Sequence, residues 1–186
     1  MSARAPQAAG FGLRLLTGLL LAAVALPALA QYREYADYAK QDLADWKEDA
    51  VPPPPSYSTS RLIEIEMPRT SSVRMGIDPK TIRINQDTGI VRYVVVARGP
   101  SAVNASYEGM RCATAEYRVY ARQVQGSAWL PAGDGEWKDM RAQSGAQLSY
   151  PYNLARGGMC HGVSVPLSVA DMVNDLEGEN PSMYAR

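Results

Sequence analysis

The sequence contains little histidine, cysteine and phenylalanine: one His, two Cys and one Phe among 186 residues. A single histidine, His161, offers no spacing from which the serine and acid of a catalytic triad can be picked out. Also absent are G-x-S-x-G and H-E-x-x-H segments, a glycine-rich phosphate loop and a calcium-binding loop. The sequence therefore predicts no cofactor and no metal, and it favours a protein that is not an enzyme.

An excess of charge of either sign is also absent. Nineteen Lys and Arg are balanced by nineteen Asp and Glu. Proteins that bind nucleic acids need many Lys and Arg opposite the phosphates, because counterion release drives that association. We therefore expect no nucleic-acid partner.

No hydrophobic run is long enough to span a membrane. The longest one covers residues 15–26 and follows the basic residues Arg4 and Arg14. A helix of twelve residues spans about 18 Å, well short of the roughly 30 Å hydrocarbon core of a membrane. Small residues follow the run, as at a signal-peptide cleavage site. The predicted cleavage site comprises Ala28, Ala30 and Gln31. We interpret residues 1–30 as a secretory signal peptide, and no cysteine near the site is available to carry a lipid.

The remaining chain is long enough for one domain with one core, and we expect no membrane span in it. Fifteen Arg against four Lys, with abundant Ala, is a composition typical of a GC-rich bacterial genome. The predicted localisation is therefore the periplasm. The predicted parts are a signal peptide (1–30), a helix with a proline-rich connector (31–60), an α+β domain (61–177) and a tail (178–186).

Two cysteines, Cys112 and Cys160, remain after cleavage. In an oxidising compartment the default is an intramolecular disulfide. Closing a loop of about 49 residues stabilises a fold by roughly 4 kcal/mol in the chain-entropy model. Two alternatives stay open: a thiol switch, and a metal or nucleophilic site of Cys160 with His161. The second is disfavoured because adjacent residues on an extended chain point apart.

Helical spacing is confined to the two ends of the mature chain. Residues 32–48 carry Tyr and Leu side chains at that spacing, which predicts an amphipathic helix. Prolines 52–55 end it and predict a semi-rigid connector over residues 50–60. Near the C-terminus, Ser168 is a good N-cap for a helix over residues 168–177.

Between these ends the pattern alternates with period two, as in strands. The predicted strands cover residues 62–67, 81–85, 90–98, 103–112 and 113–122. Turn residues between the second and third predict a hairpin, and the third strand is apolar on both faces, which predicts a central position. On the fifth strand, regular alternation places Arg118, Tyr120 and Arg122 on one face. Residues 142–163 are rich in Gly and Ser and predict a long surface segment pinned by Cys160.

The predicted fold is α+β: one antiparallel sheet of about five strands, with an N-terminal and a C-terminal helix packed on it. A small β-sandwich is the alternative.

Several segments together resemble one family. They are D-W-K-E before the prolines (45–48), G-I-V-R-Y (89–93), Y-E-G-M-R-C (107–112), E-Y-R-V-Y-A (116–121) and Trp137. The sequence is similar in these segments to the cryptic neisserial protein-like family of exported proteobacterial proteins. The resemblance covers roughly residues 45–177 and implies an exported, single-domain protein. It implies no activity, substrate or catalytic residue.

The leading functional hypothesis is a non-catalytic periplasmic binding or accessory module whose partner is an envelope protein or glycan. The candidate binding surface consists of Arg and Tyr side chains of the sheet: Arg83, Arg92, Arg118, Tyr120 and Arg122. The alternative is a hydrolase or transferase that acts on an envelope polymer with the paired carboxylates of Glu108 and Glu116.

Overall fold

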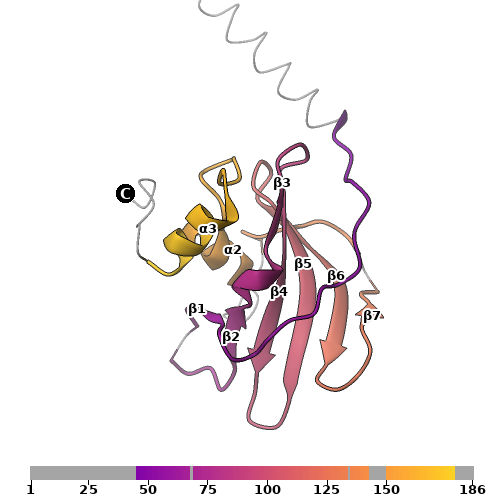
Figure 1. Cartoon of the computed structure of the whole chain (residues 1–186), viewed down its shortest axis with the longest axis vertical. Coiled ribbons are helices and arrows are strands. Elements are labelled where there is room, and N and C mark those ends of the chain that lie inside the picture. The colour runs from indigo at the N-terminus through magenta and orange to yellow at the C-terminus, as the bar shows by residue number, and fades with distance from the viewer. Residues whose placement is uncertain (1–44, 68, 134, 143–149, 179–186) are drawn as a thin grey trace, which may run out of the picture. The chain divides into compact units, whose positions relative to one another are not determined.

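Strand β4 (Ile90–Arg98) is the centre of the fold, because it pairs along its whole length with β5 (Val103–Arg111). In turn β5 pairs with β6 (Glu116–Val124), and these three long strands form the middle of an open antiparallel sheet (Figure 1). Short strands flank these three: β2 (Arg74–Ile77) and β3 (Arg83–Asn85) pair with β4, β1 (Ile63–Ile65) pairs with β2, and β7 (Leu130–Pro131) and β8 (Lys138–Asp139) pair with β6.

This computed structural model describes residues 45–67, 69–133, 135–142 and 150–178. The predicted signal peptide and the tail from residue 179 lie outside the described residues. Residues 1–47 form a unit separate from residues 48–186, and the sheet and its helices belong to the second unit. Only residues 45–48 of the predicted helix over residues 32–48 are described: Asp45 is helical and residues 46–48 are not, so the predicted C-terminal boundary is wrong.

The α+β class and the antiparallel pairing are confirmed, but the predicted count of about five strands is too low. The five predicted strands do not include β2, which contains Gly76, or the two-residue strands β7 and β8. The sequence of residues 129–137 predicts a further hairpin or a decorated loop. A side chain at Gly76 would lie 2.8 Å from Cβ of Leu62, so glycine lets β1 pass close to β2. All of the described strands belong to one sheet, so the alternative of a β-sandwich is wrong.

The two faces of the sheet are covered differently. We call the side of Val91, Tyr93 and Val95 the helix face, since it packs with helical segments in the larger core. These are α2 (Tyr150–Leu154), the π-helical turn η2 (Ala155–Met159) and α3 (Val169–Leu176). The opposite side, with Arg92, Val94 and Val96, is the strap face. Because both faces of β4 are buried, the predicted central, two-sided strand is confirmed.

The helical segments on the helix face correct one prediction. Residues 150–159 are not part of a surface segment: Tyr150, Leu154 and Met159 are buried in the core. The glycines of this segment instead allow its backbone to pack closely against α3. Gly158 has φ of 140°, and a side chain there would lie 2.5 Å from Cβ of Asp175 in α3. The N-cap of α3 is confirmed, since the hydroxyl of Ser168 accepts a hydrogen bond from the backbone N–H of Asp171.

The strap face is crossed by residues 48–60, which we call the strap (indigo in Figure 1). At its start Glu48 and Asp49 bond to side chains of the sheet. Near its end the ring of Tyr57 packs edge-on against Trp129, and the backbone N–H of Ser58 donates to the carboxylate of Asp78 at 2.7 Å. The strap thus lies along the sheet, and its anchoring side chains hold residues 48–49 in a non-helical conformation.

A β-bulge in β6 overturns the regular alternation predicted for that strand. Tyr107 pairs with Ala121 while Glu108 pairs with Val119, so Tyr120 is the extra residue on β6. One extra residue reverses the side to which all later side chains point. Arg118 therefore belongs to the strap face, whereas Arg122 lies on the helix face opposite Ser106.

Candidate functional site

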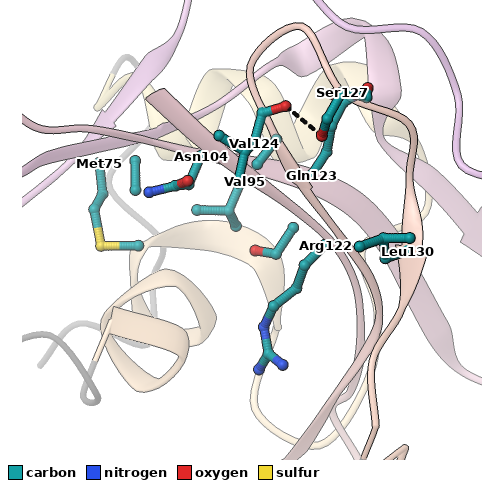
Figure 2. A pocket seen from close by; sticks show the side chains of 11 residues that line it. Met75, Val95, Asn104, Arg122, Gln123, Val124, Ser127 and Leu130 are labelled. Atoms are coloured by element: carbon teal, nitrogen blue, oxygen red, sulfur yellow. Dashed lines mark hydrogen bonds between the residues drawn. The ribbon is translucent and has the colours of Figure 1, made fainter. Parts of the chain in front are cut away.

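The helices leave one end of the helix face open, and a groove of about 290 Å³ lies there (Figure 2). Its floor is apolar, with Met75 from β2 and Val95 and Ala97 from β4. Val124 and Leu130 add exposed apolar side chains, and the polar lining includes Asn104, Ser106, Arg122, Gln123 and Ser127. We call this site the sheet groove. An apolar floor with few polar groups is typical of small-ligand sites.

Arg122 is the cationic group of the sheet groove. The bulge at Tyr120 places it on this face, opposite Ser106 of β5. The residue is exposed, and within the described ranges no carboxylate forms an ion pair with its guanidinium. The sheet groove thus combines an apolar floor with an accessible positive charge.

A buried carboxyl group lies beside the groove. Glu108 of β5 is 1% exposed, and its Oε1 accepts hydrogen bonds from the hydroxyls of Ser106 and Tyr150. Burial raises the pKa of Glu108 to about 7, although these two hydrogen bonds and the charge of Arg122 favour the ionised form. Ser106 both lines the groove and contacts the carboxyl, so it connects the two.

The strap face carries a second polar cluster around Glu48. One carboxylate oxygen of Glu48 accepts from Nη1 of Arg118 at 2.7 Å, and the other accepts from the hydroxyl of Tyr120 at 2.5 Å. Arg92 donates to both oxygens of Asp49, at 2.9 and 2.7 Å, and to Glu48 at 3.3 Å. The side chain of Arg92 is 6% exposed and that of Glu48 12%. The strap therefore occupies these basic groups.

The charges of this cluster stabilise one another. The hydrogen bond from Arg92 lowers the pKa of Asp49. Burial acts against the charge of Arg92, but the hydrogen bonds and charge interactions with Asp49 and Tyr120 together outweigh it and raise the pKa of Arg92. Burial and the neighbouring Glu48 raise the pKa of Tyr120. We therefore assign this cluster to the attachment of the strap.

The five residues predicted as one binding surface do not come together. Arg92, Arg118 and Tyr120 surround Glu48, and Arg83 pairs with Arg92 in register, its guanidinium bonded to the backbone carbonyls of Lys80 and Ile82. Arg122 lies on the opposite face. Their binding role stays a prediction, and only Arg122 lines the sheet groove.

The two carboxylates considered for catalysis lie on opposite faces. Glu108 is on the helix face, whereas Glu116, three ladder positions along, belongs to the strap face next to Arg111 and Thr114. Both acids of a glycosidase-type pair must reach the same bond. The structure therefore does not assemble the predicted pair.

The cysteine pair forms the disulfide Cys112–Cys160. It joins the end of β5 to the segment that follows η2. The sulfur of Cys160 is thereby engaged, and Nε2 of His161 lies 2.7 Å from the carboxylate of Asp175 in α3. The disulfide therefore links the helical segments covalently to the sheet, and Cys160 and His161 do not form a joint metal or nucleophilic site.

Two features are absent from the part of the chain that the structure describes. No group of three His, Cys, Asp or Glu side chains is arranged to hold a metal ion there. No helix in those ranges is both long and apolar enough to cross a bilayer.

Sequence reasoning missed most of the groove. Alternation placed Val95 and Ala97 on one face of β4, but only the positions of the helices show that this end stays uncovered. Met75 and Leu130 lie outside the five predicted strands, and the regular alternation predicted for β6 missed the bulge that places Arg122 on the helix face.

The fold and the groove define a class: a disulfide-bonded α+β domain with one open antiparallel sheet and an amphipathic groove on one face. The chain belongs to the CNP1-like family, whose model matches residues 41–177. The resemblance noted in the sequence segments is thereby confirmed. No curated protein and no solved structure matches the chain.

Proposed function

We propose that this protein is an exported, non-catalytic binding module of the bacterial periplasm and that the sheet groove is its ligand site. The observation that carries the proposal is the exposed guanidinium of Arg122, which forms no ion pair with the described carboxylates, beside an apolar floor of Met75, Val95 and Ala97. Most basic groups of the long strands are engaged by the chain's own carboxylates, whereas this one faces solvent. A charged group placed this way supplies orientation, and the floor supplies apolar contact.

Export is the second part of the proposal. It is supported by the leader-like sequence of residues 1–30 and by the Cys112–Cys160 disulfide, which is typical of oxidising compartments. The test is fractionation of the producing bacterium, with mass spectrometry of the N-terminus and titration of free thiols. We expect a periplasmic chain that begins at Gln31 and has no free thiol. A cytoplasmic chain that keeps its leader would contradict export.

Ligand binding is tested by thermal shift. A panel of metals, glycan fragments, lipids and nucleotides is screened, because a ligand that binds the native state raises the melting temperature. The variant Ala97→Leu fills the groove, and Ala102→Leu makes the same change in the exposed turn between β4 and β5. We expect at least one stabilising compound whose effect is lost in Ala97→Leu and kept in Ala102→Leu. If no compound stabilises the protein, or its effect survives in Ala97→Leu, the groove is not the ligand site.

A further inference from the structure

We infer that the sheet groove binds a small amphipathic monocarboxylate, and that protonation of Glu108 increases as the ligand carboxylate pairs with Arg122. This inference rests on the proposed function, because it names the ligand class of the same site.

The size of the groove limits the ligand. A volume of about 290 Å³ holds about ten non-hydrogen atoms at roughly 30 Å³ each. The apolar floor runs from Met75 of β2 across Val95 and Ala97 of β4 to Val124 of β6. A short hydrocarbon chain or ring with one head group fits this space, whereas a glycan would place hydroxyl groups against apolar side chains.

The charge of the groove selects the head group. Arg122 is the cation that lines it, and its guanidinium presents donors that match the two oxygens of a carboxylate. The side-chain amides of Asn104 and Gln123 are neutral. One cation at the edge of an apolar floor therefore favours one negative charge on the ligand.

Glu108 couples this binding to protons. The described groups that interact with its carboxyl are Ser106 of β5, Tyr93 of β4, Arg122 of β6 and Tyr150 of α2. Tyr117 of β6 interacts in turn with Tyr93 and Tyr150. Arg122 is the cation among them. When a ligand carboxylate pairs with Arg122, the ionised form of Glu108 loses part of that attraction and gains a negative neighbour.

The structure also provides a place for the proton. Oε1 of Glu108 accepts from Ser106 and Tyr150, but Oε2 is buried and has no hydrogen-bond partner among the described residues. The buried hydroxyl of Tyr93 likewise has no hydrogen bond of normal geometry within the described residues, but it interacts with the Glu108 carboxyl. Protonation at Oε2 converts the carboxylate to a neutral acid, and Tyr93 provides a hydroxyl oxygen that can accept its hydrogen bond.

The ligand class is tested by titrating octanoate and its neutral analogue octanamide into the mature protein, purified from the bacterium that produces it. Both have an eight-carbon chain, so they differ only in the head group. We expect octanoate to bind with a dissociation constant on the order of 1 mM or lower, and octanamide to bind at least about tenfold more weakly. Equal affinity for the two probes would contradict the inference that the ligand is a carboxylate, although the groove would still be a binding site.

Variants locate the head group. Arg122→Gln is expected to weaken octanoate binding at least about tenfold, and Arg122→Lys is expected to restore part of it because the charge returns. Arg83→Gln removes a positive charge from the strap face and serves as the control. Loss of binding in Arg83→Gln, with none in Arg122→Gln, would move the site to the other face.

The number of protons taken up per octanoate bound is measured by calorimetry at pH 7 in two buffers with different ionisation enthalpies. We expect a fraction of one proton to be taken up, and several-fold tighter binding at pH 6 than at pH 8. Glu108→Gln is expected to bind octanoate without either effect. Binding that is independent of pH in the native chain would overturn the role of Glu108. If neither octanoate nor any compound of the panel binds in the groove, the proposed function itself fails.

Discussion

Gly109 of β5 lies directly beneath the aromatic ring of Tyr120 of β6. A Cβ atom at Gly109 would stand 2.8 Å from Cζ and 2.9 Å from Cε2 of that ring. The bulge at Tyr120 and the missing side chain of Gly109 together bring the Tyr120 hydroxyl to Glu48 of the strap. The relationship thus connects an irregularity of the sheet to the attachment of the N-terminal segment.

The first prediction concerns this contact. Gly109→Ala is expected to displace the Tyr120 ring, break its hydrogen bond to Glu48 and lower the free energy of unfolding by about 2 kcal/mol. Chemical denaturation measures the change. Gly133→Ala is the control, because a Cβ there meets no atom within 4 Å. Equal stability of the two variants would show that Tyr120 moves aside without cost.

The second prediction concerns the charge of Glu48. Glu48→Gln removes a compensating charge from the buried Arg92 and the half-buried Arg118, which is expected to cost about 3 kcal/mol of unfolding free energy. The variant is also expected to expose the strap to proteases. The control is Glu66→Gln, since Glu66 is exposed. If Glu48→Gln lowers the free energy of unfolding by less than about 0.5 kcal/mol, the cluster around Glu48 does not anchor the strap.

The third prediction compares two adjacent glycines in η2. Gly158→Ala places a methyl group against the backbone of α3 at a φ of 140°, so we expect a loss of about 3 kcal/mol. Gly157→Ala meets only Cδ2 of Leu176 at 3.7 Å and is expected to change stability by less than about 1 kcal/mol. Thermal denaturation followed by circular dichroism separates the two. A tolerated Gly158→Ala would contradict the close packing of η2 on α3.

The fourth prediction concerns pH. The folded pKa of Glu108, about 7, lies above its ordinary value of 4.5, so the native state binds this proton more tightly than the unfolded chain. The resulting stabilisation is fully present below about pH 4.5 and is lost as the pH rises through about 7. The difference corresponds to about 3 kcal/mol. Denaturation between pH 5 and pH 8 is expected to show this slope in the native chain and to lose it in Glu108→Gln. Identical slopes would mean that Glu108 keeps an ordinary pKa.

Local patterns were sufficient to predict the middle of the sheet. Period-two alternation identified β4, and the polar turn before it identified the hairpin with β3, because both features arise within a few neighbouring residues. The cap of α3 by Ser168 is local in the same way. These elements could be predicted because alternation, turn residues and helix caps each depend only on residues close together in the sequence.

Long-range features were not predictable. The burial of Tyr150 was not predicted although the disulfide was, because the glycine-rich composition of residues 142–163 does not show that Gly158 packs closely against α3. The side of Arg122 depends on one extra residue in β6. The candidate surface failed to come together for that reason, and because Glu48, far away in sequence, occupies Arg92 and Arg118.

The central claim is that the sheet groove holds a ligand beside Arg122, and a titration of the ¹⁵N-labelled protein with octanoate tests it most directly. We expect the amide signals of the groove to shift in a saturable manner, those of Val95, Ala97, Arg122 and Leu130 among them, and the shifts to vanish in Arg122→Gln. Shifts that are absent, or that concentrate around Arg83 and Arg92 on the strap face, would contradict the claim.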